Sequence, residues 1–188
     1  MATNHTLPSS ATPMYLIGQA ADAAGIPVVT LKNWLNPARG VVLPGGGGGA
    51  KGAPRLFSLL RIYQIAITAE LVRLGQDPSA SAKAALKFSD TGAGSGKAKR
   101  RPGQLFEDGD TYLCVTPGGA ARVVKVPSDL TVRELVSELT AGNPSRGLIM
   151  LNLESIVLSV RHSLGLPWHT DGEPSLDAQT AKRPKVEA

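Results

Sequence analysis

The segment that most constrains the fold of this chain runs from Tyr15 to Trp34. Its first half places small and apolar residues at helical spacing, and Gly25 can adopt the positive φ that ends a helix. Pro27 suits the first turn of a second helix, where its missing N–H has no intrahelical partner. Apolar residues then favour one face, at Val28, Leu31 and Leu35. The segment therefore predicts two short helices joined by a tight turn, which is the pattern of a helix-turn-helix.

The second helix of such a motif carries side chains that can enter the major groove of DNA. Asparagine pairs with adenine, lysine reaches guanine, and a valine methyl group can contact the methyl group of thymine. We therefore predict DNA contacts from five residues of this helix, namely Val28, Val29, Thr30, Lys32 and Asn33. The alternative interpretation is an ordinary helical hairpin whose polar side chains are only solvated.

A hairpin is predicted next, because two short apolar runs flank five consecutive glycines. Its arms are Val41–Leu43 and Arg55–Phe57, and we expect Arg39, Lys51 and Arg55 around it to neutralise phosphates. A nucleotide-binding loop is not expected here, because Lys51 is followed by glycine and not by the serine or threonine that such a loop needs.

Two further helices and a linker follow the hairpin. Ser58 to Leu74 is so apolar that the helix must be covered on most sides, and Ser58 is a suitable N-cap. A shorter helix begins at Asp77-Pro78-Ser79 and ends at Phe88. Residues 91–104 are rich in Gly, Ser, Lys and Arg, which predicts a flexible basic linker. This linker is either a solubilising spacer or an arm that lies along phosphates.

The positive charge of the chain is concentrated in its first half. Residues 1–90 hold eight Lys and Arg against four Asp and Glu, and residues 91–104 hold four basic residues and no acidic one. The rest of the chain carries more acidic than basic side chains. The first half and the linker are therefore the parts expected to face a polyanion, with a solvated basic surface as the alternative.

The pattern changes after the linker to that of a small α+β unit. Strands are predicted at residues 111–116 and 121–126 around a Pro-Gly-Gly turn, and a third at 147–153. Helices are predicted at 131–140 and 154–164. The expected fold class is α+β. The expected organisation is a DNA-binding domain at 14–90, the linker at 91–104, and a second domain at 105–166 for dimerisation or partner binding. Residues 1–13 and 167–188 are expected to be disordered.

No catalytic or metal-binding constellation appears in the sequence. The single cysteine, Cys114, lies in an apolar run and is expected to be a buried thiol, and the three histidines are scattered. Glu107, Asp108 and Asp110 flank a turn and are expected to be solvated charges. No apolar run is long enough to cross a bilayer. We therefore expect no enzyme activity, no cofactor and no membrane association, and a cytoplasmic, nucleoid-associated location.

From Tyr15 to Gly75 the chain resembles the winged-helix DNA-binding domain of the MerR family of bacterial regulators. The resemblance rests on residues whose order and spacing both fit. They are Tyr15, Ile17, Gly18, Ala20, Ala21, Gly25, Ile26, Thr30, Leu31, Lys32, Trp34, Leu43, Pro44, Arg55, Leu56, Phe57, Ser58, Ile65, Leu71, Arg73, Leu74 and Gly75. The resemblance implies that the second helix enters the major groove and that the hairpin is a wing on the DNA backbone. By position these roles would fall on Val28 to Asn33 and on Lys51 and Arg55.

The chain also departs from the MerR pattern. Lys32 stands where the family usually has arginine, the glycine-rich wing is longer than usual, and the long dimerising helix and effector-binding cysteines are missing. Metal sensing is therefore not expected. The expected function is that of a sequence-specific transcription regulator. The alternatives are a phage- or plasmid-type excisionase that bends DNA, and a protein-interaction adaptor that keeps the fold without binding DNA.

Overall fold

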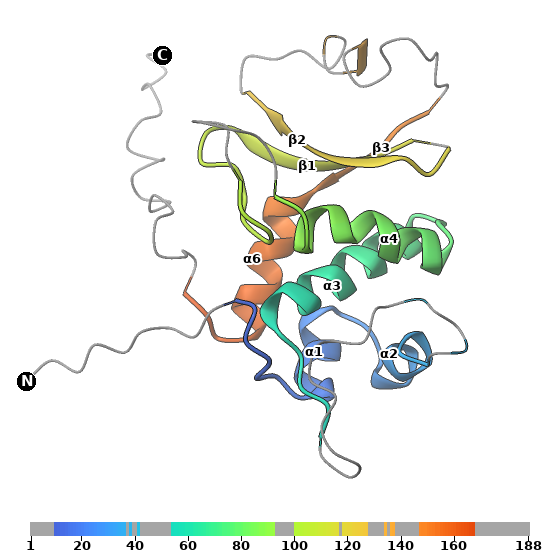
Figure 1. Cartoon of the computed structure of the whole chain (residues 1–188), viewed down its shortest axis with the longest axis vertical. Helices are drawn as coiled ribbons and strands as arrows, with labels where there is room; N and C mark the ends of the chain where they lie inside the picture. The colour runs from blue at the N-terminus through green and yellow to red at the C-terminus, as the bar shows by residue number, and fades with distance from the viewer. Residues whose placement is uncertain are drawn as a thin grey trace, which may run out of the picture.

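The structure is a computed structural model, and it describes residues 10–36, 38, 41, 54–92, 100–116, 118–127, 134, 136–137 and 147–167. Within them the chain forms five helices and one three-stranded antiparallel sheet (Figure 1). The helices are α1 (Ile17–Ala23), α2 (Val28–Trp34), α3 (Leu59–Arg73), α4 (Pro78–Ser89) and α6 (Leu153–Ser163). The strands are β1 (Asp110–Val115), β2 (Ala121–Val126) and β3 (Ile149–Asn152). The predicted α+β class is confirmed.

The two short helices predicted at the start of the chain are present as α1 and α2. Gly25 lies between them with a φ of +63° and donates its N–H to the Asp22 carbonyl at 3.0 Å. Ile26 donates to the Ala21 carbonyl at 3.0 Å, so the turn closes the last turn of α1. Pro27 is the residue just before α2 and not part of its first turn, because its backbone is extended. Ala20 and Ala21 are fully buried, and their small side chains let α1 lie close to its neighbours.

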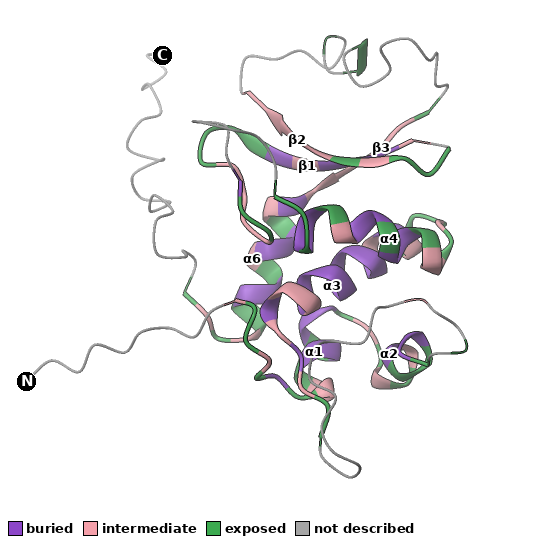
Figure 2. Cartoon of the chain, viewed as in Figure 1, coloured by how far each residue is buried: buried purple, intermediate pink, exposed green. Residues whose placement is uncertain are grey.

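Helix α3 lies at the centre of the molecule and is buried along most of its length (Figure 2). It contacts α1, α4 and α6, which covers the apolar faces that the sequence predicted. Its ends also follow the sequence, because the Ser58 hydroxyl accepts a hydrogen bond from Arg61 N at 3.3 Å and Gly75 has a φ of +85°. The helix predicted from Ser58 to Leu74 is confirmed.

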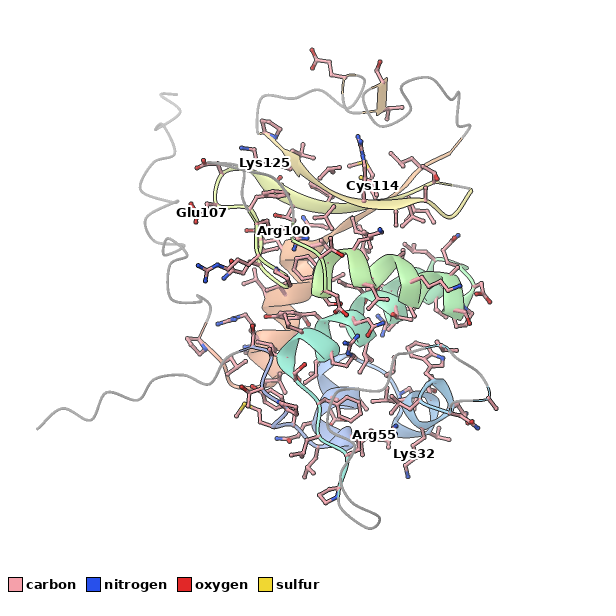
Figure 3. All side chains as sticks on the ribbon, in the orientation of Figure 1. Lys32, Arg55, Arg100, Glu107, Cys114 and Lys125 are labelled. Carbon is pink, nitrogen blue, oxygen red and sulfur yellow. The ribbon has the colours of Figure 1, made fainter. Side chains whose placement is uncertain are left out.

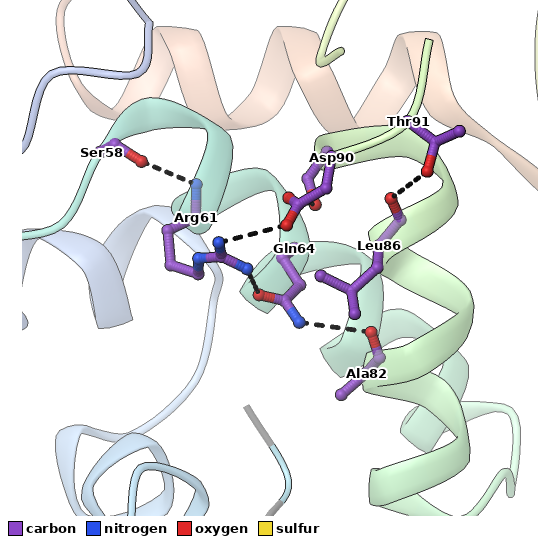
Figure 4. Close-up of polar contacts among 8 residues, drawn as sticks. Ser58, Arg61, Gln64, Ala82, Leu86, Asp90 and Thr91 are labelled. Atoms are coloured by element: carbon purple, nitrogen blue, oxygen red, sulfur yellow. Dashed lines mark hydrogen bonds and ion pairs between the residues drawn. The ribbon is translucent and has the colours of Figure 1, made fainter. Parts of the chain in front are cut away.

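Helix α4 packs along α3 and is joined to it by polar contacts (Figure 4). Its N-cap is Asp77, whose side chain accepts from Ala80 N at 2.9 Å. Gln64 is fully buried, donates to the Ala82 carbonyl at 3.3 Å, and accepts a hydrogen bond from Arg61. Arg61 also forms an ion pair with Asp90 at 3.4 Å. These contacts fix α4 against α3 in one register.

The sheet has the order β2-β1-β3, so β1 is the central strand. The predicted hairpin is present, with Leu113 opposite Val123 and a turn in which Gly119 has a φ of +78°. The predicted third strand is β3, with Leu151 opposite Leu113, and the predicted final helix is α6. The helix predicted at residues 131–140 lies almost wholly outside the described residues.

One arm of the predicted wing hairpin pairs with an unexpected partner. Phe57 and Tyr15 form an antiparallel bridge, in which Phe57 N donates to the Tyr15 carbonyl at 2.8 Å and Tyr15 N donates to the Phe57 carbonyl at 3.1 Å. Apart from Val41, the other predicted arm and the glycine run lie outside the described residues. The bridge holds the start of α1 beside the start of α3.

The structure differs from the expected division into separate domains at 14–90 and 105–166. A single hydrophobic cluster contains buried residues from both ranges, including Leu31, Ile65, Leu113 and Val160. Helix α6 contacts α1 and α3, and α4 contacts β1 and β2. The physical reason is α3, whose apolar surface is too wide for α1 and α4 alone to cover. The sheet and α6 therefore complete the core that the first half begins.

Residues 100–104 also differ from the expected flexible linker. Arg100 is 3% exposed and donates to the carbonyls of Lys87, Phe88 and Thr91 at the end of α4. A Cβ added at Gly103 would lie 2.1 Å from Leu60 Cδ2, so the backbone passes very close to α3. This stretch is therefore part of the folded core, whereas residues 93–99 of the predicted linker lie outside the described residues.

The predicted buried thiol is confirmed, and its burial makes stability depend on pH. Cys114 is 2% exposed, and burial raises the pKa of its thiol from 9.0 to about 11, with the Arg122 charge opposing the rise. The folded state therefore holds this proton more tightly than the unfolded state. We expect the thiol's contribution to stability to be complete below pH 9 and to be lost as the pH rises toward 11.

Urea unfolding of the chain and of Cys114→Ala between pH 7 and 11 measures this effect. The free energy of unfolding of the parent should fall more steeply above pH 9 than that of the variant. Parallel pH profiles for the two proteins would show that the thiol does not titrate differently on folding.

Candidate nucleic-acid interface

Helix α2 presents one continuous outward stripe. Val29, Lys32 and Asn33 are all exposed, and they lie at positions i, i+3 and i+4 of the helix. Asn36, two residues beyond the end of the helix, is exposed as well. On the opposite side of the helix the core anchors are Leu31, Trp34 and Leu35, all of which are buried. The side chain of Val29 is 64% exposed, which is unusual for a large apolar residue. The stripe thus combines one apolar group, one cation and one amide, and the amide of Asn36 follows just beyond the end of the helix.

The structure places the predicted recognition residues on two different faces. Val29, Lys32 and Asn33 belong to the stripe. Val28 does not, because it is half-buried and packs against the hydrophobic core, and Thr30 is also half-buried. Of the two valines predicted as alternatives for a thymine contact, Val29 is the more exposed.

Arg55 is the described member of the three predicted phosphate contacts. It is exposed, and Figure 3 shows Arg55 and Lys32 at the same end of the molecule, away from the sheet that carries Cys114 and Lys125. Arg39 and Lys51 lie outside the described residues. Within the described part of the chain, Arg55 is thus the predicted phosphate-contacting cation that lies at the same end of the molecule as the α2 stripe.

Asn36 is an exposed residue beside the stripe that the sequence reasoning missed. Its side-chain oxygen accepts a hydrogen bond from Ala38 N at 3.0 Å, which leaves the amide NH₂ out of that contact. Asn36 lies beyond the last residue of α2, Trp34, so helical spacing within α2 does not indicate it.

Arg73 is a second residue that the sequence reasoning missed, and it contacts the turn between α1 and α2. From the last turn of α3, its Nη2 donates to the Gly25 carbonyl at 2.7 Å, and its Nη1 pairs with Glu70. The contact joins residues 48 positions apart. A Cβ at Gly25 would lie 3.1 Å from Arg73 Nη2, so a side chain there would require Arg73 to shift slightly, and glycine is favoured by its positive φ. Arg73 therefore fixes the turn that sets the direction of α2.

The basic linker contributes less exposed charge than expected. Arg100 is buried and Arg101 is exposed, whereas Lys97 and Lys99 lie outside the described residues. Burial lowers the pKa of Arg100 to about 10, which still leaves the side chain charged at neutral pH. Arg100 is therefore a core cation and not a candidate phosphate contact.

The other predicted surface features carry no further site. Glu107, Asp108 and Asp110 are exposed, in agreement with solvated charges. Among the described residues, no three His, Cys, Asp or Glu side chains are close enough to hold a metal ion. No helix in that part of the chain is both long and apolar enough to cross a membrane. No protein-family model matches the chain, and no curated protein matches it significantly.

Proposed function

We propose that this chain binds double-stranded DNA in a sequence-specific manner and regulates transcription, without a catalytic step or a cofactor. The observation that carries the proposal is the outward stripe on α2. A short helix held by buried anchors and exposing a valine, a lysine and an asparagine has the shape and the chemistry that the major groove accepts. In this proposal α2 is the recognition helix.

Charge and position support the same assignment. The stripe carries no acidic residue, and Arg55 adds a cation at the same end of the molecule. The resemblance to the MerR winged-helix domain assigns the same helix to the major groove and adds the glycine-rich wing as a backbone contact. The proposal extends these roles to Arg39 and Lys51, and gives residues 105–166 a role in a homodimer or a protein contact.

Salt dependence of binding tests the proposal directly. The full chain is titrated with mixed genomic fragments at several salt concentrations, and the logarithm of the binding constant is plotted against the logarithm of salt. We expect a slope of several units, because each phosphate neutralised contributes about 0.9. Binding that is absent, or that does not respond to salt, would rule out the DNA-binding function and favour a protein-interaction role.

Separate changes at Asn33 and Arg55 distinguish base recognition from backbone contact. Asn33→Ala should relax the sequence preference, because an asparagine pair with a base contributes about 1–3 kcal/mol of discrimination. Arg55→Ala should weaken all sites about equally and lower the salt slope by about one. Selection of binding sites from a random DNA library, followed by titration, measures both effects. If the two variants behave alike, the assignment of recognition helix and wing is wrong.

A further inference from the structure

A cleft of about 590 Å³ opens between α1, α3 and α6. One of its walls includes Gly25 and the end of α1, which is the turn that leads into α2. The other walls come from α3 and α6, which lie side by side in Figure 1. The volume lies within the roughly 300–1,000 Å³ range of small-molecule sites. Among the described residues proposed to contact DNA, none lines this cleft.

The cleft has an apolar floor and a polar rim. The floor is made of small and branched apolar side chains that are all buried, namely Ala23, Ala24, Ala66, Ile156 and Val160. The wall formed by α6 presents three exposed or half-exposed hydroxyl groups at successive turns of the helix, at Ser155, Ser159 and Ser163. Such a surface can bury the apolar body of a small molecule and orient its polar end.

The charges on the rim of the cleft determine which charge the polar group of a ligand should carry. Glu70 and Arg73 neutralise each other, and Arg73 also binds the Gly25 carbonyl. Asp22 is exposed, and its carboxylate has no ion pair among the described residues. With histidine counted as neutral, the rim therefore carries one excess negative charge. A carboxylate ligand would meet Asp22 and would have to displace Glu70 from Arg73.

We propose that the cleft binds a small organic amine with an apolar body, with its ammonium group at the Asp22 carboxylate and its body on the alanine, isoleucine and valine floor. Because Gly25 forms part of the wall, the bound amine contacts the turn that Arg73 holds and that sets the direction of α2. The amine therefore changes the affinity of the chain for DNA. This second step rests on the proposed function, whereas amine binding itself does not.

Three probes of similar shape test the site in the full chain without DNA. They are 2-phenylethylamine, 2-phenylethanol and phenylacetate, and binding is followed by the shifts of backbone amide signals in NMR titrations. We expect saturable shifts at the cleft residues with the amine, and weaker binding of the alcohol and the carboxylate. Equal binding of all three probes, tighter binding of phenylacetate, or shifts elsewhere on the molecule would overturn the proposal.

A matched pair of variants localises the ammonium group. Asp22→Asn should weaken binding of the amine about two- to fivefold, as expected for an exposed ion pair, and should leave the alcohol unaffected. Asp108→Asn makes the same chemical change at an exposed carboxylate outside the cleft, and should leave the affinity unchanged. Equal effects of the two variants would show that Asp22 does not receive the amine.

The DNA titration with and without saturating 2-phenylethylamine tests the regulatory step. A change in DNA affinity whose half-maximal amine concentration rises about two- to fivefold in Asp22→Asn supports the coupling, and an unchanged DNA affinity overturns it while the binding site stands. If the chain binds no DNA, the proposed function is wrong. The three-probe titration still decides whether the cleft binds the amine.

Discussion

Replacement of Arg100 by methionine is expected to lower the free energy of unfolding by about 3–5 kcal/mol. The guanidinium donates five hydrogen bonds to carbonyl oxygens within the described part of the chain, with Nη1 reaching Phe88, Arg101 and Gln104 and Nη2 reaching Lys87 and Thr91. It also lies 5.1 Å from the centre of the Phe88 ring. Methionine fills similar space but removes all five of these hydrogen bonds. The Phe88 and Arg101 carbonyls keep the backbone donors Gly103 N and Gln104 N, whereas the carbonyls of Lys87, Thr91 and Gln104 lose the guanidinium as their donor.

Two further variants, one at Arg100 and one at the neighbouring Arg101, separate the effects of charge, hydrogen-bond geometry and burial on stability. Arg100→Lys keeps the charge but loses the planar fork, so we expect an intermediate loss, because one ammonium group cannot reach carbonyls on both sides. Arg101→Met makes the same change at the neighbouring exposed position and should shift stability by less than about 0.5 kcal/mol. Urea unfolding followed by circular dichroism measures all three. Equal midpoints for Arg100→Met and Arg101→Met would show that the buried network does not stabilise the fold.

Reversal of the charge at Lys32 is expected to have the largest effect on DNA binding. Lys32→Glu removes a cation from the centre of the α2 stripe and places a carboxylate against the DNA, whose backbone is a dense array of negative charge. We expect the affinity to fall by at least about 30-fold, which corresponds to about 2 kcal/mol. The fold should be retained, because Lys32 is exposed and has no ion pair among the described residues.

The control is the same charge reversal on a different helix. Lys83 is exposed on α4, which packs against α3 and the sheet, so Lys83→Glu should lower DNA affinity only through the change in net charge. Fluorescence anisotropy with a selected DNA site measures the two affinities, and circular dichroism checks that both variants are folded. A similar loss of DNA affinity in both variants would mean that α2 contacts the DNA no more closely than α4 does.

Local patterns were sufficient for the helices and strands. Ser58 and Gly75 marked the ends of α3, because a hydroxyl can cap the first turn and a glycine can adopt positive φ after the last. The runs rich in Val, Tyr and Thr around the Pro-Gly-Gly turn predicted β1 and β2, because strand composition and turn chemistry are both short-range properties. In the candidate interface, helical spacing alone placed Lys32 and Asn33 away from the apolar face of Val28, Leu31 and Leu35, but the half-burial of Thr30 depends on what α2 packs against.

Local sequence patterns could not predict the long-range contacts. Composition predicted a flexible linker at 91–104, because glycine, serine and basic residues usually stay in water. Arg100 nevertheless enters the core, since unpaired carbonyls at the end of α4 supply acceptors that nothing near it in sequence reveals. The same reasoning explains why Arg73 was missed, because its partner at Gly25 is 48 residues away.

The sequence by itself determined the α+β class, the two short helices around Gly25, the long apolar helix and the β-hairpin, because each depends on neighbours within a few residues. The tertiary structure alone decided that both halves of the chain share one core, that Arg100 is buried, and which side chains of α2 face outward with Asn36. These features depend on which surfaces meet. The apolar surface of α3 must be covered by something, but only the folded chain shows that α1, α4 and α6 cover it and that the sheet packs on α4 and α6.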